Sequence, residues 1–126
     1  VIPDIGLTVT ASNVKGDNGT SAVQILVQIR PEHLGFVEKD GRKKGAIEVA
    51  VFCADDKERL LGESWNTVDI EMTPDAFAKF QTSGLRYTGK VPVKAAARFI
   101  KVVVYDPGAD VLGSTVFKID PPKVKK

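Results

Sequence analysis

The chain has 126 residues, 43% of them hydrophobic, which is the size and composition of one folded domain rather than of a disordered segment. A formal net charge of +2 is too small to indicate nucleic acid or an anionic membrane surface as the partner. A single cysteine excludes an internal disulfide, and no apolar run is long enough to insert directly into a membrane.

Apolar and polar residues alternate along most of the chain, a period-two pattern that is typical of half-buried strands. The alternation predicts about seven strands, at residues 5–11, 23–29, 47–53, 60–72, 85–93, 100–104 and 115–119. Polar links rich in turn residues separate them, at 12–21, 31–45 and 54–59 among others. This succession predicts an all-β fold, an antiparallel β-sandwich of the immunoglobulin or fibronectin type III class.

One segment has the features of a short helix, near residues 73–81. Thr73 can cap its first turn, Pro74 suits the first helical position, and Asp75 complements the helix dipole. Phe77 and Phe80 then share one face. We therefore expect a helix of one or two turns between two strands of a single sandwich domain at 1–120, followed by a basic tail at 121–126.

The stretch between the last two strands contains Asp106, Pro107, Gly108 and Asp110. Proline and glycine suit a tight reversal, in which Asp106 can accept backbone N–H groups. The alternative is a calcium site, which needs six to eight converging oxygens. In a simple sandwich this turn shares one end with the 31–45 link, while Asp55 lies at the other end. The sequence therefore favours a turn and predicts no metal site or cofactor.

Catalytic residues are not predicted either. Cys53 falls on the apolar row of its strand, where a buried core thiol is expected. His33 lies in the 31–45 link, at the other end of that strand, so the pair cannot approach to the roughly 3 Å that a nucleophile and its base need. The sequence contains no Gly-x-Ser-x-Gly elbow and no phosphate-binding loop.

Candidate contact residues for a partner lie in two places. The 31–45 link offers Phe36, Arg42, Lys43 and Lys44, although Phe36 is more simply interpreted as a plug of the core beneath the link. Trp65 is a possible binding aromatic, but a lone tryptophan packs against a sheet more often, and packing is the favoured interpretation. A small ligand or carbohydrate site at Trp65 stays open as the alternative.

The order of these features resembles a known family. The successive segments DIGLTVTA, VQILVQIRPEHLGFVEKDGRKKGAIEVAVFCADDKERLL, FQTSGLRYTGKVPV and RFIKVVVYDPGADVLGSTVFKI resemble the C-terminal β-sandwich of bacterial VWFA-related proteins, a group common in Acidobacteria. Matching motifs are the Leu34-Gly35-Phe36 element, the charged hairpin Lys39-Asp40-Gly41-Arg42, the Asp55-Asp56 turn, the strand end Val103-Val104-Tyr105-Asp106, and Gly113-Ser114. The chain departs from the family at 94–97, where Lys-Ala-Ala-Ala replaces a proline–glycine turn.

The resemblance implies a non-catalytic accessory, spacer or interaction domain of an exported bacterial protein, located in the periplasm, on the cell surface or outside the cell. In the family the metal-binding Asp-x-Ser-x-Ser motif belongs to the preceding VWFA domain, and this chain lacks it. The implied partner is a neighbouring VWFA-like domain or another protein. Because the chain opens at Val1-Ile2-Pro3 without methionine, we expect a fragment or processed form of a longer polypeptide.

Overall fold

The structure, a computed structural model, describes residues 5–32 and 34–119. The basic tail expected at 121–126 and the candidate base His33 lie outside these residues. Within them the elements follow in the order β1 (Leu7–Lys15), η1 (Asp17–Gly19), β2 (Ser21–Ile29), β3 (Val37–Lys39), β4 (Arg42–Ala54), β5 (Leu60–Met72), α1 (Pro74–Ser83), β6 (Leu85–Pro92), β7 (Phe99–Asp106) and β8 (Val111–Lys118).

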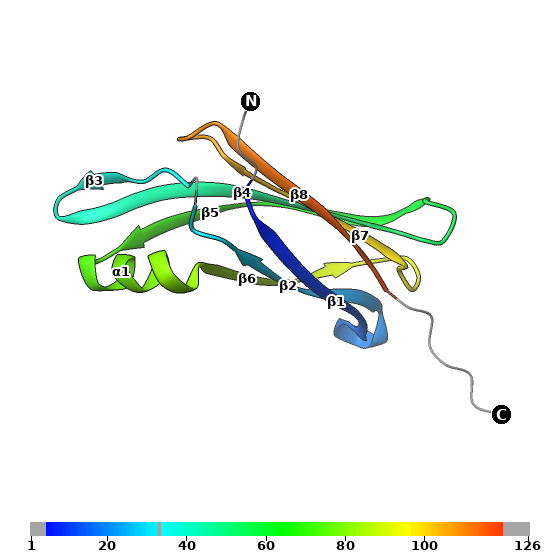
Figure 1. Cartoon of the computed structure of the whole chain (residues 1–126). Helices are drawn as coiled ribbons and strands as arrows, with labels where there is room; N and C mark the ends of the chain where they lie inside the picture. Colours follow the sequence, from blue (N-terminus) through cyan, green and yellow to red (C-terminus); the bar gives the residue numbers. More distant parts are fainter. Residues whose placement is uncertain (1–4, 33, 120–126) are drawn as a thin grey trace.

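The strands form two antiparallel sheets that lie one over the other (Figure 1). One sheet has three strands in the order β1-β2-β6. In the five-stranded sheet, β4 pairs with β5 along one edge and with both β7 and the short β3 along the other, and β8 lies beyond β7. The predicted all-β sandwich is confirmed.

The core lies between the sheets and consists of the inward-facing rows that the alternation predicted. The central strands contribute most of it: Val23, Ile25, Val27 and Ile29 from β2, Ile47, Val49, Val51 and Cys53 from β4, and Ile100, Val102 and Val104 from β7. Each of these side chains is almost fully buried. Burial on this scale is the main favourable contribution to the stability of such a domain.

Several strand boundaries differ from the prediction, for local reasons. β1 continues to Lys15, into the region expected to be a turn, because Asn13 pairs with Val23 and its side chain binds the Ala97 backbone twice, at 3.0 and 2.9 Å. These hydrogen bonds also hold Ala97, the last residue of the 94–97 segment, in place. β4 begins at Arg42 because Asp40 and Gly41 adopt positive φ values of 55° and 76°, which close a two-residue hairpin with β3.

The helix is longer than predicted, because α1 extends to Ser83 instead of ending near residue 81. Its start is as expected: the Thr73 hydroxyl accepts a hydrogen bond from the Ala76 N–H at 3.2 Å, with Pro74 as the first helical residue. The extra turn ends at Gly84, whose φ of 76° directs the chain into β6.

The two ends of the sandwich carry different links. The 31–41 link, α1 and the β7–β8 turn lie together at one end, and the β4–β5 turn lies at the other (Figure 1). At the first end Ile5 donates to Leu112, and at the second Ile119 donates to Arg98, so the described chain enters and leaves at opposite ends. No helix in the described ranges has the length and apolar character needed to cross a membrane.

Candidate functional site

Asp106 is the buried acidic residue of the β7–β8 turn, with only 2% of its surface exposed. One carboxylate oxygen accepts the N–H groups of Gly108 and Ala109 at 2.9 and 3.3 Å. The other accepts the Gly35 N–H, which is 71 residues away in the chain, at 2.7 Å. The predicted turn role of Asp106 is confirmed, and the carboxylate also fixes the 31–41 link. These three N–H donors use most of the roughly four lone-pair sites of the carboxylate, so the side chain acts as an acceptor within the fold.

The other aspartate of this turn faces outward. Asp110 accepts a hydrogen bond from the Tyr105 hydroxyl at 2.7 Å, and this hydrogen bond raises the pKa of Tyr105. The two aspartates therefore act separately within the turn and share no ligand position. In the described ranges, no three histidine, cysteine or acidic side chains gather where they could hold a metal ion.

The acidic turn between β4 and β5 lies at the opposite end, as predicted. Asp55 accepts from the Arg59 and Lys57 N–H groups at 2.9 Å each and from the Arg59 side chain at 2.8 Å. The hydrogen bond from the Arg59 N–H is the main reason that the pKa of Asp55 is lowered. Its carboxylate is thus used to close the turn, and it cannot join Asp106 in one site.

Cys53 is a core residue, as predicted. It is fully buried on the inner face of β4, and burial raises the pKa of its thiol to about 11. A protonated, inaccessible thiol is a poor nucleophile. The predicted separation of Cys53 from His33 involves a residue outside the described ranges.

The buried thiol gives a first prediction. A thiol reagent at pH 8 should label Cys53 in the folded chain at least about a hundredfold more slowly than in urea-unfolded chain. An unfolded thiol ionises near pH 9.0 and the folded one near 11, so the folded state should lose about 2 kcal/mol of stability as the pH rises through that window. Urea titrations between pH 8 and 11 measure this loss of unfolding free energy, and Cys53→Ala, which lacks the thiol, is the control. Labelling at the unfolded rate would contradict the buried placement.

The candidate contacts in the 31–45 link are engaged within the chain. Phe36 packs edge to face against Phe77 and Phe80 of α1, with ring centroids 5.8 and 5.2 Å apart. This confirms the interpretation of Phe36 as a plug. Lys43 lies on the same side, pairing with Glu38 at 3.3 Å and approaching the Phe77 ring at 5.3 Å.

Arg42 and Lys44 lie on the other face of the hairpin, where both pair with Glu71, at 3.7 and 3.2 Å. Such exposed pairs stabilise the fold little, and the single carboxylate of Glu71 offsets one of the two positive charges. The strand register places Lys44 six residues along β4 from Ala50, the partner of Trp65, a separation of about 20 Å. The structure therefore does not bring the predicted basic contacts and Trp65 into one site.

Trp65 lies on the outer face of β5, and 65% of its surface is exposed. It does pack edge to face against Phe52 of β4, with centroids 5.5 Å apart and an interplanar angle of 86°. The favoured interpretation of Trp65 as a packed residue is thus only partly right. The Phe52 contact orients the indole and leaves most of it free.

Trp65 belongs to an exposed apolar surface that sequence reasoning did not identify. The register places it on the same outer face of the five-stranded sheet as other apolar side chains, and we call this group the outer patch: Phe52, Leu60, Trp65, Phe99, Leu112 and Val116. Leu60, Leu112 and Val116 are 52%, 44% and 59% exposed. The signal in the sequence was Val116, which interrupts the apolar row of its strand by facing the opposite way.

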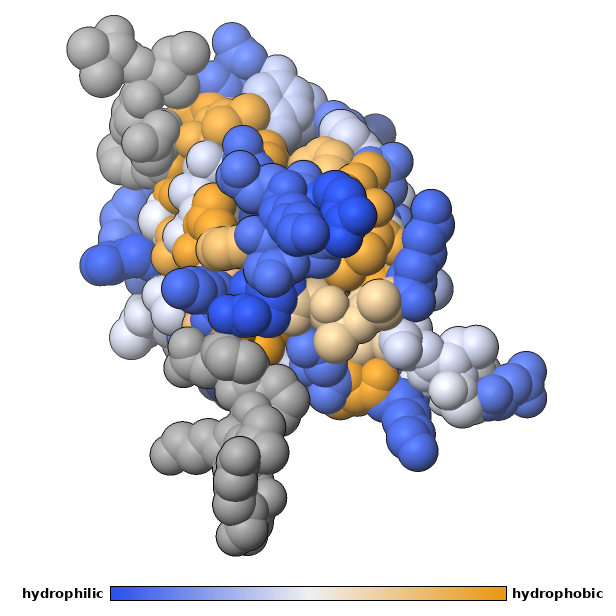
Figure 2. Space-filling model, turned by 90° about the vertical axis from the view of Figure 1, so that its right-hand side faces the viewer, coloured by the Kyte–Doolittle hydropathy of each residue, from blue (hydrophilic) through white to orange (hydrophobic). Residues whose placement is uncertain are grey.

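A hollow of about 300 Å³ opens within the outer patch near the β4–β5 turn. Phe52, Leu60, Phe99 and Val116 form its floor and walls, and Glu58 and Lys101 stand at its rim. Figure 2 looks at this end of the molecule, where blue hydrophilic residues occupy the centre and orange hydrophobic residues lie beside them. An apolar depression with a charged rim is the usual composition of a protein contact surface.

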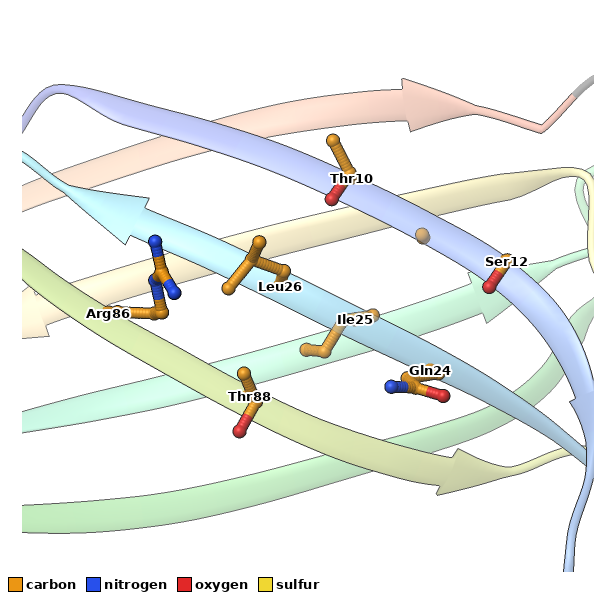
Figure 3. Close-up of a pocket in the computed structure, with 8 residues that line it drawn as sticks. Thr10, Ser12, Gln24, Ile25, Leu26, Arg86 and Thr88 are labelled. Atoms are coloured by element: carbon orange, nitrogen blue, oxygen red, sulfur yellow. The ribbon is translucent and has the colours of Figure 1, made fainter.

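The outer face of the three-stranded sheet has a different character. A shallow hollow of about 440 Å³ there is lined largely by polar side chains from β1, β2 and β6, among them Thr10, Ser12, Gln24, Arg86 and Thr88 (Figure 3). These are exposed residues standing on the polar side of each strand, as on the solvated face of any antiparallel sheet. The two outer faces thus contrast: among the described residues, the large exposed apolar groups of the sheets lie on the five-stranded one.

Comparison with known proteins returns no match, either to protein-family models or to curated protein sequences.

Proposed function

We propose that this chain is a non-catalytic accessory domain, an interaction or spacer module, of an exported bacterial VWFA-related protein. The observation that carries the proposal is the outer patch, where four large apolar side chains are 44–65% exposed on one sheet face. Surface of this kind is costly to leave in water, at roughly 25 cal/mol per Å². A contiguous patch of it on a folded domain usually marks a contact surface.

Two further features support a spacer role over a catalytic one. The described chain enters and leaves the sandwich at opposite ends, a geometry that suits a domain in a linear array. The Asp55 and Asp106 carboxylates are engaged in turns, and the Cys53 thiol is buried in the core. The proposed partners are a neighbouring VWFA-like domain of the same polypeptide or another protein. A hydrolase screen showing turnover that is abolished by Cys53→Ala would overturn the non-catalytic assignment.

Fractionation of native cells tests the cellular part of the proposal. An antibody against this domain should detect a band several times larger than 13.6 kDa in the envelope or exported fraction. A band near 13.6 kDa in the cytosol would contradict the proposal, because an accessory domain should be part of a larger chain and that chain should be exported.

The second candidate function is a carbohydrate-binding module, favoured by the exposed indole of Trp65. Exposed aromatic faces stack on sugar rings, and polar side chains beside Trp65 on β5, such as Glu63 and Thr67, could bond sugar hydroxyls. Fold alone supports neither function over the other.

Trp65→Ala separates the two functions. Because most of the indole is already exposed, we expect the substitution to lower the free energy of unfolding by only about 1 kcal/mol, mainly through the lost contact with Phe52. We expect no glycan retention in affinity electrophoresis for either the original chain or the variant. Retention by the original chain that Trp65→Ala abolishes, with stability intact, would replace the interaction module with the carbohydrate-binding module.

A further inference from the structure

We propose that the outer patch binds a second copy of this chain, in a dimer whose two-fold axis lies parallel to the strands. The inference rests on the proposed function and names the partner of the same surface. It follows from three properties of the outer face: its shape, the placement of its charges, and its size.

The shape of the face is self-complementary across the sheet. Strand order places β5 and β8 at opposite sides, with β4 and β7 between them. Trp65, Ala50, Val103 and Ser114 form one row across the four strands. A two-fold axis parallel to the strands, between β4 and β7, would lay β5 of one copy over β8 of the other. The projecting Trp65 would then meet the small Ser114, between the exposed Leu112 and Val116.

The charges on the face are also self-complementary. Glu63 stands on the β5 side, next to Phe52, and Glu58 stands at the same rim. Lys101 and Lys118 stand on the β7–β8 side. Among the described residues neither Glu63 nor Lys118 forms an ion pair, although Lys118 lies 6.0 Å from the Phe99 ring. The same rotation brings the acidic side of each copy to the basic side of the other, twice per dimer.

The size of the face sets the expected strength. The face consists of four strands spaced about 4.8 Å apart and four rows of outward-facing residues spaced about 7 Å apart. It therefore covers on the order of 500 Å² in each copy, or about 1,000 Å² in the two copies together. This area lies near the lower limit for a specific interface, so we expect a reversible dimer with a dissociation constant in the micromolar range, on the order of 1–100 µM.

Analytical ultracentrifugation of the 126-residue chain from about 1 to about 500 µM tests the dimer. The mass should rise with concentration towards twice 13.6 kDa. Glu63→Lys and Lys118→Glu should each weaken self-association by about tenfold or more, because each creates like charges at both contacts. Both positions are exposed, so both variants should fold, and circular dichroism checks this.

The decisive measurement mixes these two variants in equal amounts. In a mixed dimer both contacts regain opposite charges, so association should return to the original strength. Arg86→Glu, a charge reversal on the outer face of the three-stranded sheet, is the matched control and should leave association unchanged. A chain that stays monomeric throughout, a mixture that does not recover, or an equal effect of Arg86→Glu would each overturn the dimer. A monomer that still contacts a different protein through Trp65 would leave the proposed function standing.

Discussion

Replacing Asp106 with alanine is expected to lower the free energy of unfolding by about 3 to 4 kcal/mol, which is a large part of the stability of a domain of this size. The substitution removes the acceptor of three N–H groups, those of Gly35, Gly108 and Ala109. The site is 2% exposed, so water cannot readily replace the lost acceptor. The loss should also release the 31–41 link from the β7–β8 turn. Urea unfolding followed by circular dichroism measures the stability change.

Asp110→Ala is the matched control for this variant. It lies in the same turn and loses one exposed hydrogen bond, from the Tyr105 hydroxyl. Its φ of 55° is also less favourable for alanine than for aspartate, so we expect a total change of about 1 to 1.5 kcal/mol, well below that of Asp106→Ala. Amide hydrogen exchange adds a local measure, since the Gly35 N–H should exchange much faster in Asp106→Ala and unchanged in Asp110→Ala. Equal destabilisation by both variants would show that Asp106 contributes only to the turn.

Gly84→Ala is expected to lower the free energy of unfolding by about 3 kcal/mol, through two costs of similar size. Gly84 follows α1 with φ 76° and ψ −166°, a conformation that side chains other than glycine rarely adopt. In addition, a Cβ at this position would collide with the carbonyl oxygen of Ile29, in the central strand of the three-stranded sheet. Neither the helix end nor β2 can move without disturbing the core.

Two other glycines separate these costs. Gly41→Ala has a similar φ but open space around it, so it should show the backbone cost alone, about 1 kcal/mol. Gly89→Ala in β6 has neither a positive φ nor a close neighbour and should change stability by less than about 0.5 kcal/mol. Thermal unfolding of the three variants ranks them. If Gly84→Ala is no worse than Gly41→Ala, the close approach of the α1 end to Ile29 is not as described.

The sequence allowed the fold to be predicted because alternation reports burial directly. The inward rows of β2, β4 and β7 were the residues predicted, and both the sandwich and the separation of its two acidic turns follow from them. The predicted strand bounds were wrong where contacts between distant parts of the chain, rather than the local apolar pattern, determine the structure. β1 extends through polar residues because Asn13 bonds to Ala97, and β3 is three exposed residues that pair only because a two-residue turn returns the chain.

The candidate surface was less predictable for a different reason. Alternation identifies which residues face away from the core, but not whether another element covers them. Trp65 was expected to be packed. The structure shows instead that β5 pairs with β4 and that no other element covers most of the Trp65 side chain on the outer face of β5. In the same way, Pro107 and Gly108 allowed the turn role of Asp106 to be predicted. The hydrogen bond that Asp106 accepts from the Gly35 N–H could not be predicted, because it depends on where the 31–41 link lies.

Photo-crosslinking in native cells tests the central claim most directly, that the outer patch is the contact surface of a non-catalytic module. A photoreactive amino acid would replace Trp65 in one variant and Thr88, exposed on the outer face of the three-stranded sheet, in the other. We predict that irradiation joins the domain to another protein chain from position 65 and not from position 88. No adduct from position 65, or equal adducts from both faces, would contradict the account.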